Sequence, residues 1–278
     1  MILAILLSSD YTLDLKKNKL KRLISTGQLA LGTHIDTYSP TLIEIAGLAG
    51  FDYVYIEAEH APLNWETFEH LIRAAELSDL TSLVRLDEEP LNHLVRKALE
   101  AGVQGVIIPH ISTVEEAKAA VQAMKFPPEG VRGMGTMRAR RYGVIPLVDY
   151  LEWSNQESLV ILLIEEKVAV ENIEEILSVK GVDVVVFGPS DYSISIGVPG
   201  QTTHPYVLDA RRKVVETALR LNVAPMITCN TIEQVKECLK MGVRLLSLGG
   251  DARVLLQSWR EMIDNARKAF RTTINTRR

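Results

Sequence analysis

Eight short runs of apolar, β-favouring residues recur along the chain of 278 residues, and runs with helical periodicity lie between them. This alternation predicts a parallel sheet whose strands are joined by helical crossovers. Eight such strands in a chain of this length predict an α/β fold, a single (β/α)₈ TIM barrel. The expected strands are Leu29–Ile35, Tyr53–Glu59, Ser82–Asp87, Gly105–His110, Leu159–Glu165, Asp183–Phe187, Ala224–Thr228 and Arg244–Leu248.

The helices expected between the strands have the lengths that barrel crossovers need. They are Pro40–Leu48, Trp65–Glu76, Leu91–Glu100, Val114–Met124, Glu171–Leu177, Val207–Leu221, Ile232–Met241 and Leu255–Phe270. Thr113 and Glu116 predict a capping box at the start of the fourth helix. The basic amphipathic segment Asp14–Ile24 is expected to form an N-terminal helix that caps the bottom of the barrel. No linker or change in composition divides residues 1–278, which are interpreted as one domain.

Two segments depart from the alternation. Residues 1–13 are expected to be an irregular extension or a locally packed strand. The apolar stretch Met1–Leu7 is too short to span a bilayer and lacks the basic residues of a secretory signal. Residues 127–155 form a long connection after the fourth helix, and connections of that length are usually functional or partly helical.

Composition excludes several classes of partner. The formal net charge is −4 and the basic residues are mostly scattered, so no nucleic acid is expected to bind. No membrane contact is expected either. Cys229 and Cys238 have neither metal-site spacing nor the density of a disulfide scaffold, which fits a reducing cytoplasm. We interpret both as small buried hydrophobic residues.

Ionisable residues stand at the C-terminal ends of most expected strands, where barrel enzymes place their catalytic groups. They are His34, Asp36, Glu57, Glu59, His60, Arg85, Asp87, His110, Glu165, Glu166, Lys167, Asp191 and Asp251. An apolar strand has no structural need for a carboxylate at its end. Several such groups on one rim therefore predict a polar site.

Glu165 and Asp191 are the strongest candidates for metal ligands, since they lie at the ends of adjacent strands. Two carboxylates, with water and substrate filling the other positions, are typical of Mg²⁺ or Mn²⁺ sites. The alternative is that both are helix caps or surface acids. The turn Gly188-Pro189-Ser190-Asp191 begins a short helix whose amides could bind an anionic substrate, unless it is an ordinary turn.

His60 is the candidate general base, because the intrinsic pKa of histidine lies near neutrality. Glu57 or Glu59 could orient its ring, although a lone histidine is often structural or solvated. Arg85 stands on an otherwise apolar strand and needs an anionic partner. It could neutralise charge on a substrate oxygen, or belong to a structural ion pair.

At these residues the sequence resembles the HpcH/HpaI aldolases, class II pyruvate aldolases of the phosphoenolpyruvate/pyruvate barrel superfamily. The resemblance extends from about Leu20 to Phe270. The motifs that carry it are Leu31-Gly32, Ile56–Pro62, Val84-Arg85, Ala101–Pro109, Pro127–Gly133, Glu165 with Lys167 and Asn172, and Phe187–Ser193.

The resemblance implies a role for each candidate residue. Glu165 and Asp191 would bind a divalent cation, Mg²⁺ or Mn²⁺, with Co²⁺ as an alternative. Arg85 would contact the keto or enolate oxygen, and His60 would act as the base with Glu57 beside it. The amides of the Gly188–Asp191 turn would hold the pyruvate carboxylate.

The implied reaction is the reversible cleavage of a 4-hydroxy-2-oxo acid to pyruvate and an aldehyde through a metal-stabilised enolate. 4-Hydroxy-2-oxoheptanedioate and 2-keto-3-deoxy sugar acids are representative substrates. The resemblance also implies a homohexamer in which the last helix packs on a neighbouring subunit. That helix carries a strongly apolar face, which could instead pack on its own barrel. Its apolar residues are Val254, Leu255, Leu256, Trp259 and Met262.

Three residues depart from the family pattern. Glu57 stands where the family usually has aspartate, Leu163 where it has glutamine, and His110 where it has methionine. His34 also lies near the family's substrate pocket. These departures leave two alternatives open: an oxaloacetate decarboxylase or other metal-dependent pyruvate-enolate lyase, and a catalytically silent barrel that binds an oxo acid.

Overall fold

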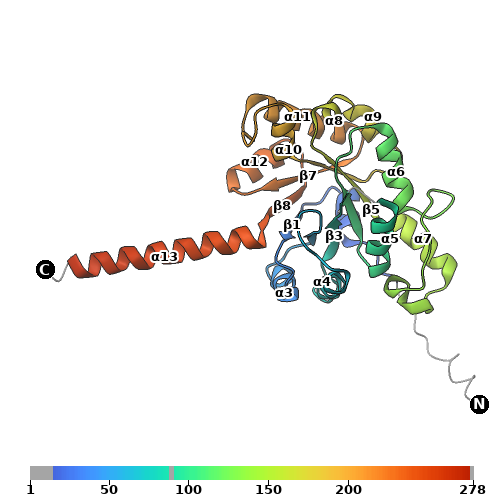
Figure 1. Cartoon of the computed structure of the whole chain (residues 1–278), viewed down its shortest axis with the longest axis horizontal. Helices are drawn as coiled ribbons and strands as arrows, with labels where there is room; N and C mark the ends of the chain where they lie inside the picture. Colours follow the sequence, from blue (N-terminus) through green and yellow to red (C-terminus); the bar gives the residue numbers. More distant parts are fainter. Residues whose placement is uncertain (1–14, 88–90, 276–278) are drawn as a thin grey trace, which may run out of the picture.

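The computed structural model describes residues 15–87 and 91–275, which form a closed barrel of eight parallel strands in sequential order (Figure 1). The first strand pairs with both the second and the eighth. The predicted TIM barrel is therefore confirmed. The strands are β1 (Ala30–Ile35), β2 (Tyr53–Glu57), β3 (Thr81–Arg85), β4 (Gly105–Ile108), β5 (Leu159–Ile164), β6 (Val184–Phe187), β7 (Ala224–Cys229) and β8 (Leu245–Gly250).

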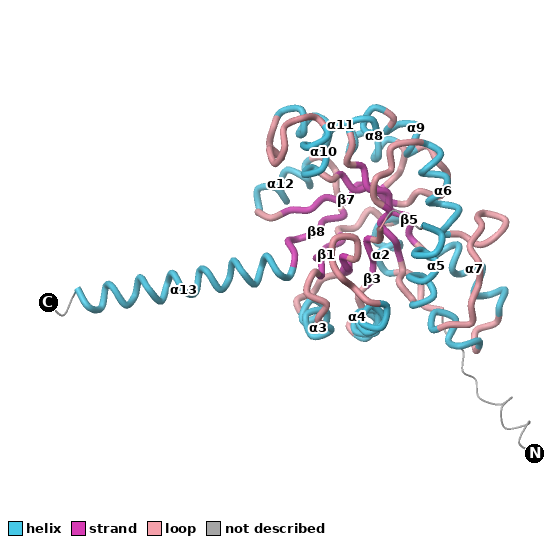
Figure 2. Tube along the Cα trace, viewed as in Figure 1, coloured by secondary structure: helices cyan, strands magenta, loops and turns pink. Residues whose placement is uncertain are grey.

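Helices surround the strands on the outside of the barrel (Figure 2). They are α3 (Pro40–Leu48), α4 (Trp65–Leu77), α5 (Leu91–Ala101), α6 (Val114–Met124), α7 (Leu147–Glu157), α8 (Lys167–Glu171), α9 (Ile173–Leu177), α10 (Pro189–Ser195), α11 (Pro205–Arg220) and α12 (Ile232–Lys240). The predicted capping box of Thr113 and Glu116 is present at the start of α6.

A helix before β1, α2 (Lys19–Ser25), supplies Leu20 and Leu23 to the cluster of side chains that fills the barrel. It begins at Lys19, so the predicted start at Asp14 was too early. The side chain of Asn18 accepts a hydrogen bond from the Lys21 amide and caps the helix at that point. Asp14 and residues 1–13 lie outside the described residues.

Alternate residues of each strand face the inside of the barrel, as strand geometry requires. Tyr53 of β2, Leu83 of β3 and Leu163 of β5 all belong to the interior cluster. Arg85 and Glu165 each follow one of these leucines by two residues. Both therefore lie on the same inner face, at the C-terminal mouth. Arg85 and Glu165 thus bring charge to the inner face at the point where their strands end.

Several predicted boundaries were wrong by a few residues. β2 ends at Glu57 and β4 at Ile108, so Glu59 and His110 lie in the loops that follow. The long connection contains η1 (Arg138–Gly143) and α7, which makes it partly helical. The helix expected at Glu171–Leu177 is two short helices, α8 and α9.

The last helix, α13 (Asp251–Asn275), leaves the barrel and projects away from it (Figure 1). Every described side chain of α13 is at least partly exposed, so its apolar face does not pack on its own barrel. Among the described residues, no helix is long and apolar enough to cross a membrane.

Candidate active site

Glu165 follows β5 directly and is 3% exposed. Its Oε1 accepts a hydrogen bond of 3.0 Å from the backbone amide of His110, and the Nδ1 atom of His110 lies 3.3 Å from the same oxygen. Burial, together with the negative charges of Glu59 and Asp191, raises the pKa of Glu165. The ionised form of Glu165 is therefore disfavoured, and a bound cation would stabilise it.

Asp191 lies in the first turn of α10, which begins just after β6. Gly188 caps this helix and lets it approach Glu165 closely. A Cβ atom on Gly188 would lie 2.9 Å from the Glu165 Cβ and 3.0 Å from its Oε2. A side chain at position 188 would therefore crowd Glu165 at the start of α10, the helix that carries Asp191. Ser190 and Asp191 themselves are exposed.

Arg85 is held by two glutamates. Its Nε donates to Glu57 Oε2 at 2.7 Å, its Nη2 lies 2.6 Å from that oxygen, and its Nε lies 3.0 Å from Glu59 Oε2. The other oxygen of Glu57 accepts hydrogen bonds from the amides of Glu59 and His60. Glu57 therefore orients Arg85 and the loop after β2 rather than the ring of His60.

The imidazole of His60 is 66% exposed, and its Nε2 lies 3.6 Å from Glu59 Oε2. Of the two glutamates considered for orienting this ring, Glu59 is the one beside it. Burial raises the pKa of Glu59, and the negative charge of Glu57 raises it further. Open access from solvent would let a substrate hydroxyl reach the ring.

Next to β2, and across the barrel from Glu165, the mouth is formed by β1 and the start of α13. His34 lies against Tyr55, with 4.6 Å between ring centroids, and burial lowers its pKa to about 4. Burial and the charge of Asp251 raise the pKa of Asp36. The carboxylate of Asp251 accepts hydrogen bonds from the amides of Asp36 and Thr37. This side of the mouth is polar, and its histidine is neutral at pH 7.

The donor set of Glu165 and Asp191 fits a hard divalent cation. Within residues 15–87 and 91–275, no hydrogen bond or ion pair occupies Glu165 Oε2 or the Asp191 carboxylate. The same described residues include no group of three or more His, Cys, Asp or Glu side chains arranged to hold a metal. A cation here would take two protein carboxylates and fill its other positions with water and substrate, as Mg²⁺ commonly does.

Two residues of the mouth had no assigned role in the sequence. His110 lies within 3.5 Å of a Glu59 oxygen as well as beside Glu165, so it connects two carboxylates. The available signal was a histidine two residues after β4, an apolar strand adjacent to β5. Leu163, where the family usually has glutamine, is buried in the apolar cluster of the barrel interior.

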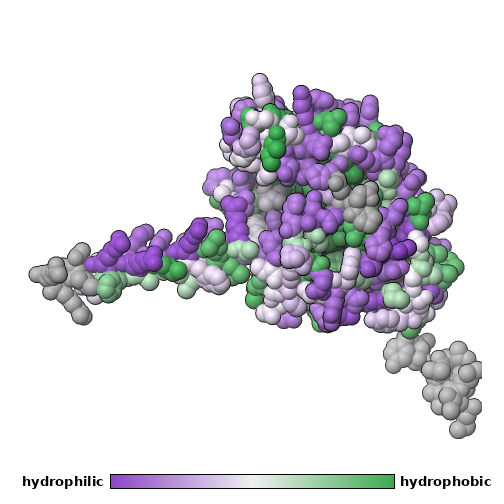
Figure 3. Space-filling model, viewed as in Figure 1, coloured by the Kyte–Doolittle hydropathy of each residue, from purple (hydrophilic) through white to green (hydrophobic). Residues whose placement is uncertain are grey.

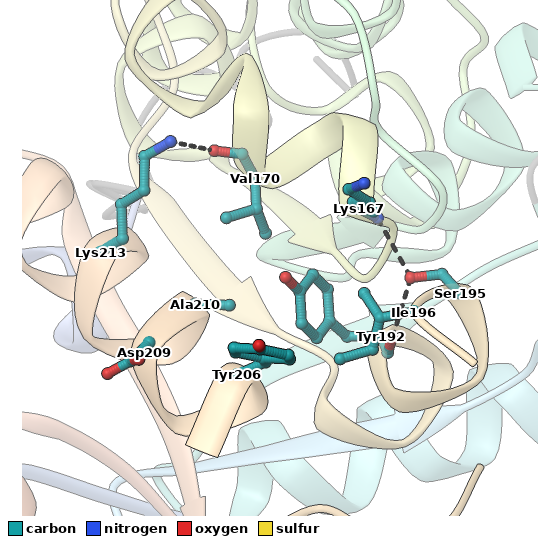
Figure 4. Close-up of a pocket in the computed structure, with 9 residues that line it drawn as sticks. All are labelled: Lys167, Val170, Tyr192, Ser195, Ile196, Tyr206, Asp209, Ala210 and Lys213. Atoms are coloured by element: carbon teal, nitrogen blue, oxygen red, sulfur yellow. Dashed lines mark hydrogen bonds between the residues drawn. The ribbon is translucent and has the colours of Figure 1, made fainter. Parts of the chain in front are cut away.

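A cavity of about 580 Å³ lies outside the carboxylate site, between α8, α10 and α11 (Figure 4). Lys213 uses its Nζ to donate to the Val170 carbonyl at 2.7 Å, and Asp209 pairs with Arg212. Tyr192 and Tyr206 supply aromatic surface. Lys167, the third charged residue that lines the cavity, lies 3.8 Å from Glu171, so each of these charged side chains has a partner.

A closed parallel barrel with carboxylates, an arginine and histidines gathered at its C-terminal mouth is the arrangement of a TIM-barrel enzyme. The sequence model of HpcH/HpaI aldolase/citrate lyase matches residues 31–258. The chain belongs to this family, and it is an enzyme of the aldolase class of lyases.

Individual relatives agree with this assignment. The chain is 37% identical to a hydroxypyruvate/pyruvate aldolase of Sagittula stellata over 70% of its own length and 76% of the relative. It is 30% identical to a 5-keto-4-deoxy-D-glucarate aldolase of Enterobacter sp. over 92% and 99%. The crystal structure of an HpcH/HpaI aldolase from Desulfitobacterium hafniense superposes with a TM-score of 0.84 at 30% identity, covering 89% and 96%.

Proposed function

We propose that this enzyme is a divalent-metal-dependent aldolase that reversibly cleaves a 4-hydroxy-2-oxo acid to pyruvate and an aldehyde. The observation that carries the proposal is the buried carboxylate of Glu165, with one oxygen unpartnered among the described residues and the charge of Asp191 near it. Arg85 lies in the same mouth as a fixed positive group for the substrate. Relatives named as aldolases for keto acids support this reaction class.

In this proposal Glu165 and Asp191 hold Mg²⁺ or Mn²⁺, or Co²⁺ in their place. When bound, such a cation acts as a Lewis acid that stabilises negative charge on the oxygen of the 2-oxo group. The amides of the Gly188–Asp191 turn, with Pro189 and Ser190 at its centre, hold the carboxylate of the oxo acid. The substrate is thereby fixed at one end between α10 and Glu165.

Side chains at the ends of β2 and β3 and in the loop after β2 accept the substrate proton and stabilise the negative charge that develops. His60 accepts the proton of the 4-hydroxyl group, and the carboxylate of Glu59 stabilises the imidazolium that results. Arg85 faces the oxygen on which negative charge develops. Glu57 keeps the guanidinium in place through two contacts to one oxygen, and its other oxygen fixes the backbone before His60.

A pyruvate-release assay tests the proposal. The purified enzyme would be offered 4-hydroxy-2-oxoheptanedioate, a 2-keto-3-deoxy sugar acid and oxaloacetate, with EDTA and after re-addition of Mg²⁺ or Mn²⁺. Metal-dependent release from a 4-hydroxy-2-oxo acid is expected. Turnover of oxaloacetate alone would indicate a decarboxylase, and binding of oxalate without turnover would indicate a silent barrel.

We also propose that the chain assembles as a cytoplasmic homohexamer in which α13 packs on a neighbouring subunit. Figure 3 shows hydrophobic residues along one side of the projecting helix and hydrophilic residues along the other. Trp259 and Met262 are 60% and 66% exposed, and an exposed stripe of this kind is typical of an interface. The buried thiols of Cys229 and Cys238 are compatible with a reducing compartment.

A further inference from the structure

His110 has a backbone conformation that few residues with a side chain adopt. It follows β4 with φ 55°, in the left-handed region. In this conformation its amide and its ring face the same partner. The amide donates to Glu165 Oε1 at 3.0 Å, and Nδ1 lies 3.3 Å from that oxygen. His110 thus contacts Oε1 of the buried Glu165 carboxylate through both its backbone amide and its ring.

The other oxygen of Glu165 faces a different neighbour. A Cβ atom on Gly188 would lie 3.0 Å from Oε2, so this oxygen lies against the start of α10. That helix carries Asp191 three residues further on. With Oε1 held on the β4 side, Oε2 is directed toward the helix that brings the second carboxylate.

The ring of His110 is itself held in place. Its Nε2 lies 3.5 Å from Glu59 Oε1, and the second oxygen of Glu59 lies 3.0 Å from Arg85 Nε. Arg85 is in turn fixed by Glu57. The ring therefore lies between Glu165 and Glu59, and its Nδ1 is also 3.8 Å from Glu166 Oε1. These contacts on both ring nitrogens restrict its rotation.

We propose that His110 is a positioning residue for the divalent cation: it holds Glu165 Oε1 so that Oε2 is presented together with Asp191. The inference rests on the proposed function, because it concerns the same two carboxylates. Groups that orient a metal-binding side chain typically contribute 10–100-fold to metal affinity. Loss of the ring is expected to weaken cation binding by about 10-fold or more.

The experiment measures Mn²⁺ binding by isothermal titration calorimetry for the wild type, His110→Gly and His110→Gln. Glycine accepts the left-handed backbone without strain, so this variant removes only the ring. Glutamine restores a side-chain donor and is expected to recover much of the affinity. His70→Ala is the matched control, because His70 is an exposed histidine of α4 outside the site.

Two further measurements separate positioning from general damage. The metal-free His110→Gly protein is expected to melt near the wild-type temperature. At saturating Mn²⁺ it is expected to recover most of the wild-type kcat, while its half-saturating Mn²⁺ concentration rises. A purely structural role would instead lower the melting temperature and leave the metal dependence unchanged.

Wild-type Mn²⁺ affinity in His110→Gly would overturn the inference. His110→Ala also lacks the ring and decides the question if the glycine variant does not fold. Absence of Mn²⁺ binding in the wild type itself would overturn the proposed function along with the inference. Binding in the wild type with equal binding in the ring-deleted variants would overturn the inference alone.

Discussion

Glu57 and Arg85 are direct partners across β2 and β3, and both the Nε and Nη2 atoms of Arg85 lie within 2.7 Å of one Glu57 oxygen. Their side chains are 8% and 18% exposed. A charged pair this far inside the barrel mouth is costly to separate, since the arginine that remains would keep its charge with less compensation. Glu57 has a longer side chain than the aspartate that is usual at this position in the family, and this side chain fixes the position of Arg85.

Glu57→Gln is expected to lower the free energy of unfolding by roughly 1–3 kcal/mol, the usual cost of losing a buried hydrogen-bonded charge. It should also lower kcat/KM, because Arg85 loses its main anchor. Thermal unfolding and pyruvate-release kinetics would measure both effects. The control is Glu69→Gln, whose partner Arg73 forms an exposed ion pair at 2.7 Å. That change is expected to cost less than about 1 kcal/mol, and equal losses in the two variants would contradict the argument.

His60→Ala is expected to reduce the rate of aldol cleavage by roughly 10²–10⁴-fold, as for the loss of a general base. Mn²⁺ affinity should stay near the wild-type value, because the ring contacts Glu59 rather than Glu165 or Asp191. Steady-state kinetics with calorimetry of Mn²⁺ binding would test both. An unchanged rate would place the base on another residue.

Glu165→Gln and Asp191→Asn are each expected to abolish Mn²⁺ binding and activity while leaving the barrel folded. In the metal-free state, Glu165→Gln should also raise the melting temperature, because it removes a buried carboxyl group whose ionised form is disfavoured. A gain of 1 kcal/mol corresponds to roughly 2–4 °C for a chain of this size. Circular dichroism, calorimetry and kinetics would follow the three effects, and full activity in either variant would remove both residues from the metal site.

The barrel could be predicted because each strand is apolar along its length and each crossover has helical periodicity. The residues of the mouth were also foreseeable, since strand ends of a barrel meet at one rim. The contacts among them were not. Whether Glu57 or Glu59 faces His60 depends on how the loop turns after β2, and that path follows from hydrogen bonds to Glu57 itself.

The direction of the His110 ring could not be predicted from the sequence pattern either. Its left-handed backbone turns the ring toward Glu165, whereas an extended continuation of β4 would follow strand alternation. The direction of α13 could not be predicted either. An amphipathic helix has the same periodicity whether its apolar face packs on its own barrel or on another chain.

His34 should make stability sensitive to acid. Burial, and then the charge of Arg85, lower its pKa from 6.5 to about 4. Between these values the unfolded chain binds a proton that the folded chain does not. The contribution of the neutral ring is therefore complete above about pH 6.5 and is lost as the pH falls toward 4. The difference amounts to roughly 3 kcal/mol.

His34→Gln removes the titrating group, so it is expected to lose less stability than the wild type between pH 7 and pH 5. Urea unfolding at both pH values would measure the difference. His70→Gln, at an exposed position on α4, serves as the control and should behave like the wild type. Equal acid losses in the wild type and His34→Gln would show that other groups control the response.

The exposed face of α13 predicts the assembly state. Trp259 and Met262 lie three residues apart on the helix, so they share one face, and both are more than half exposed. Large aromatic side chains at interface centres often contribute 2 kcal/mol or more to association. Trp259→Glu with Met262→Glu is therefore expected to convert the oligomer into smaller species, as measured by light scattering after size exclusion. Gln257→Glu adds a negative charge to the same helix at a hydrophilic residue and should leave the mass unchanged. A wild-type chain that is already monomeric, or a double variant of unaltered mass, would show that α13 does not hold subunits together.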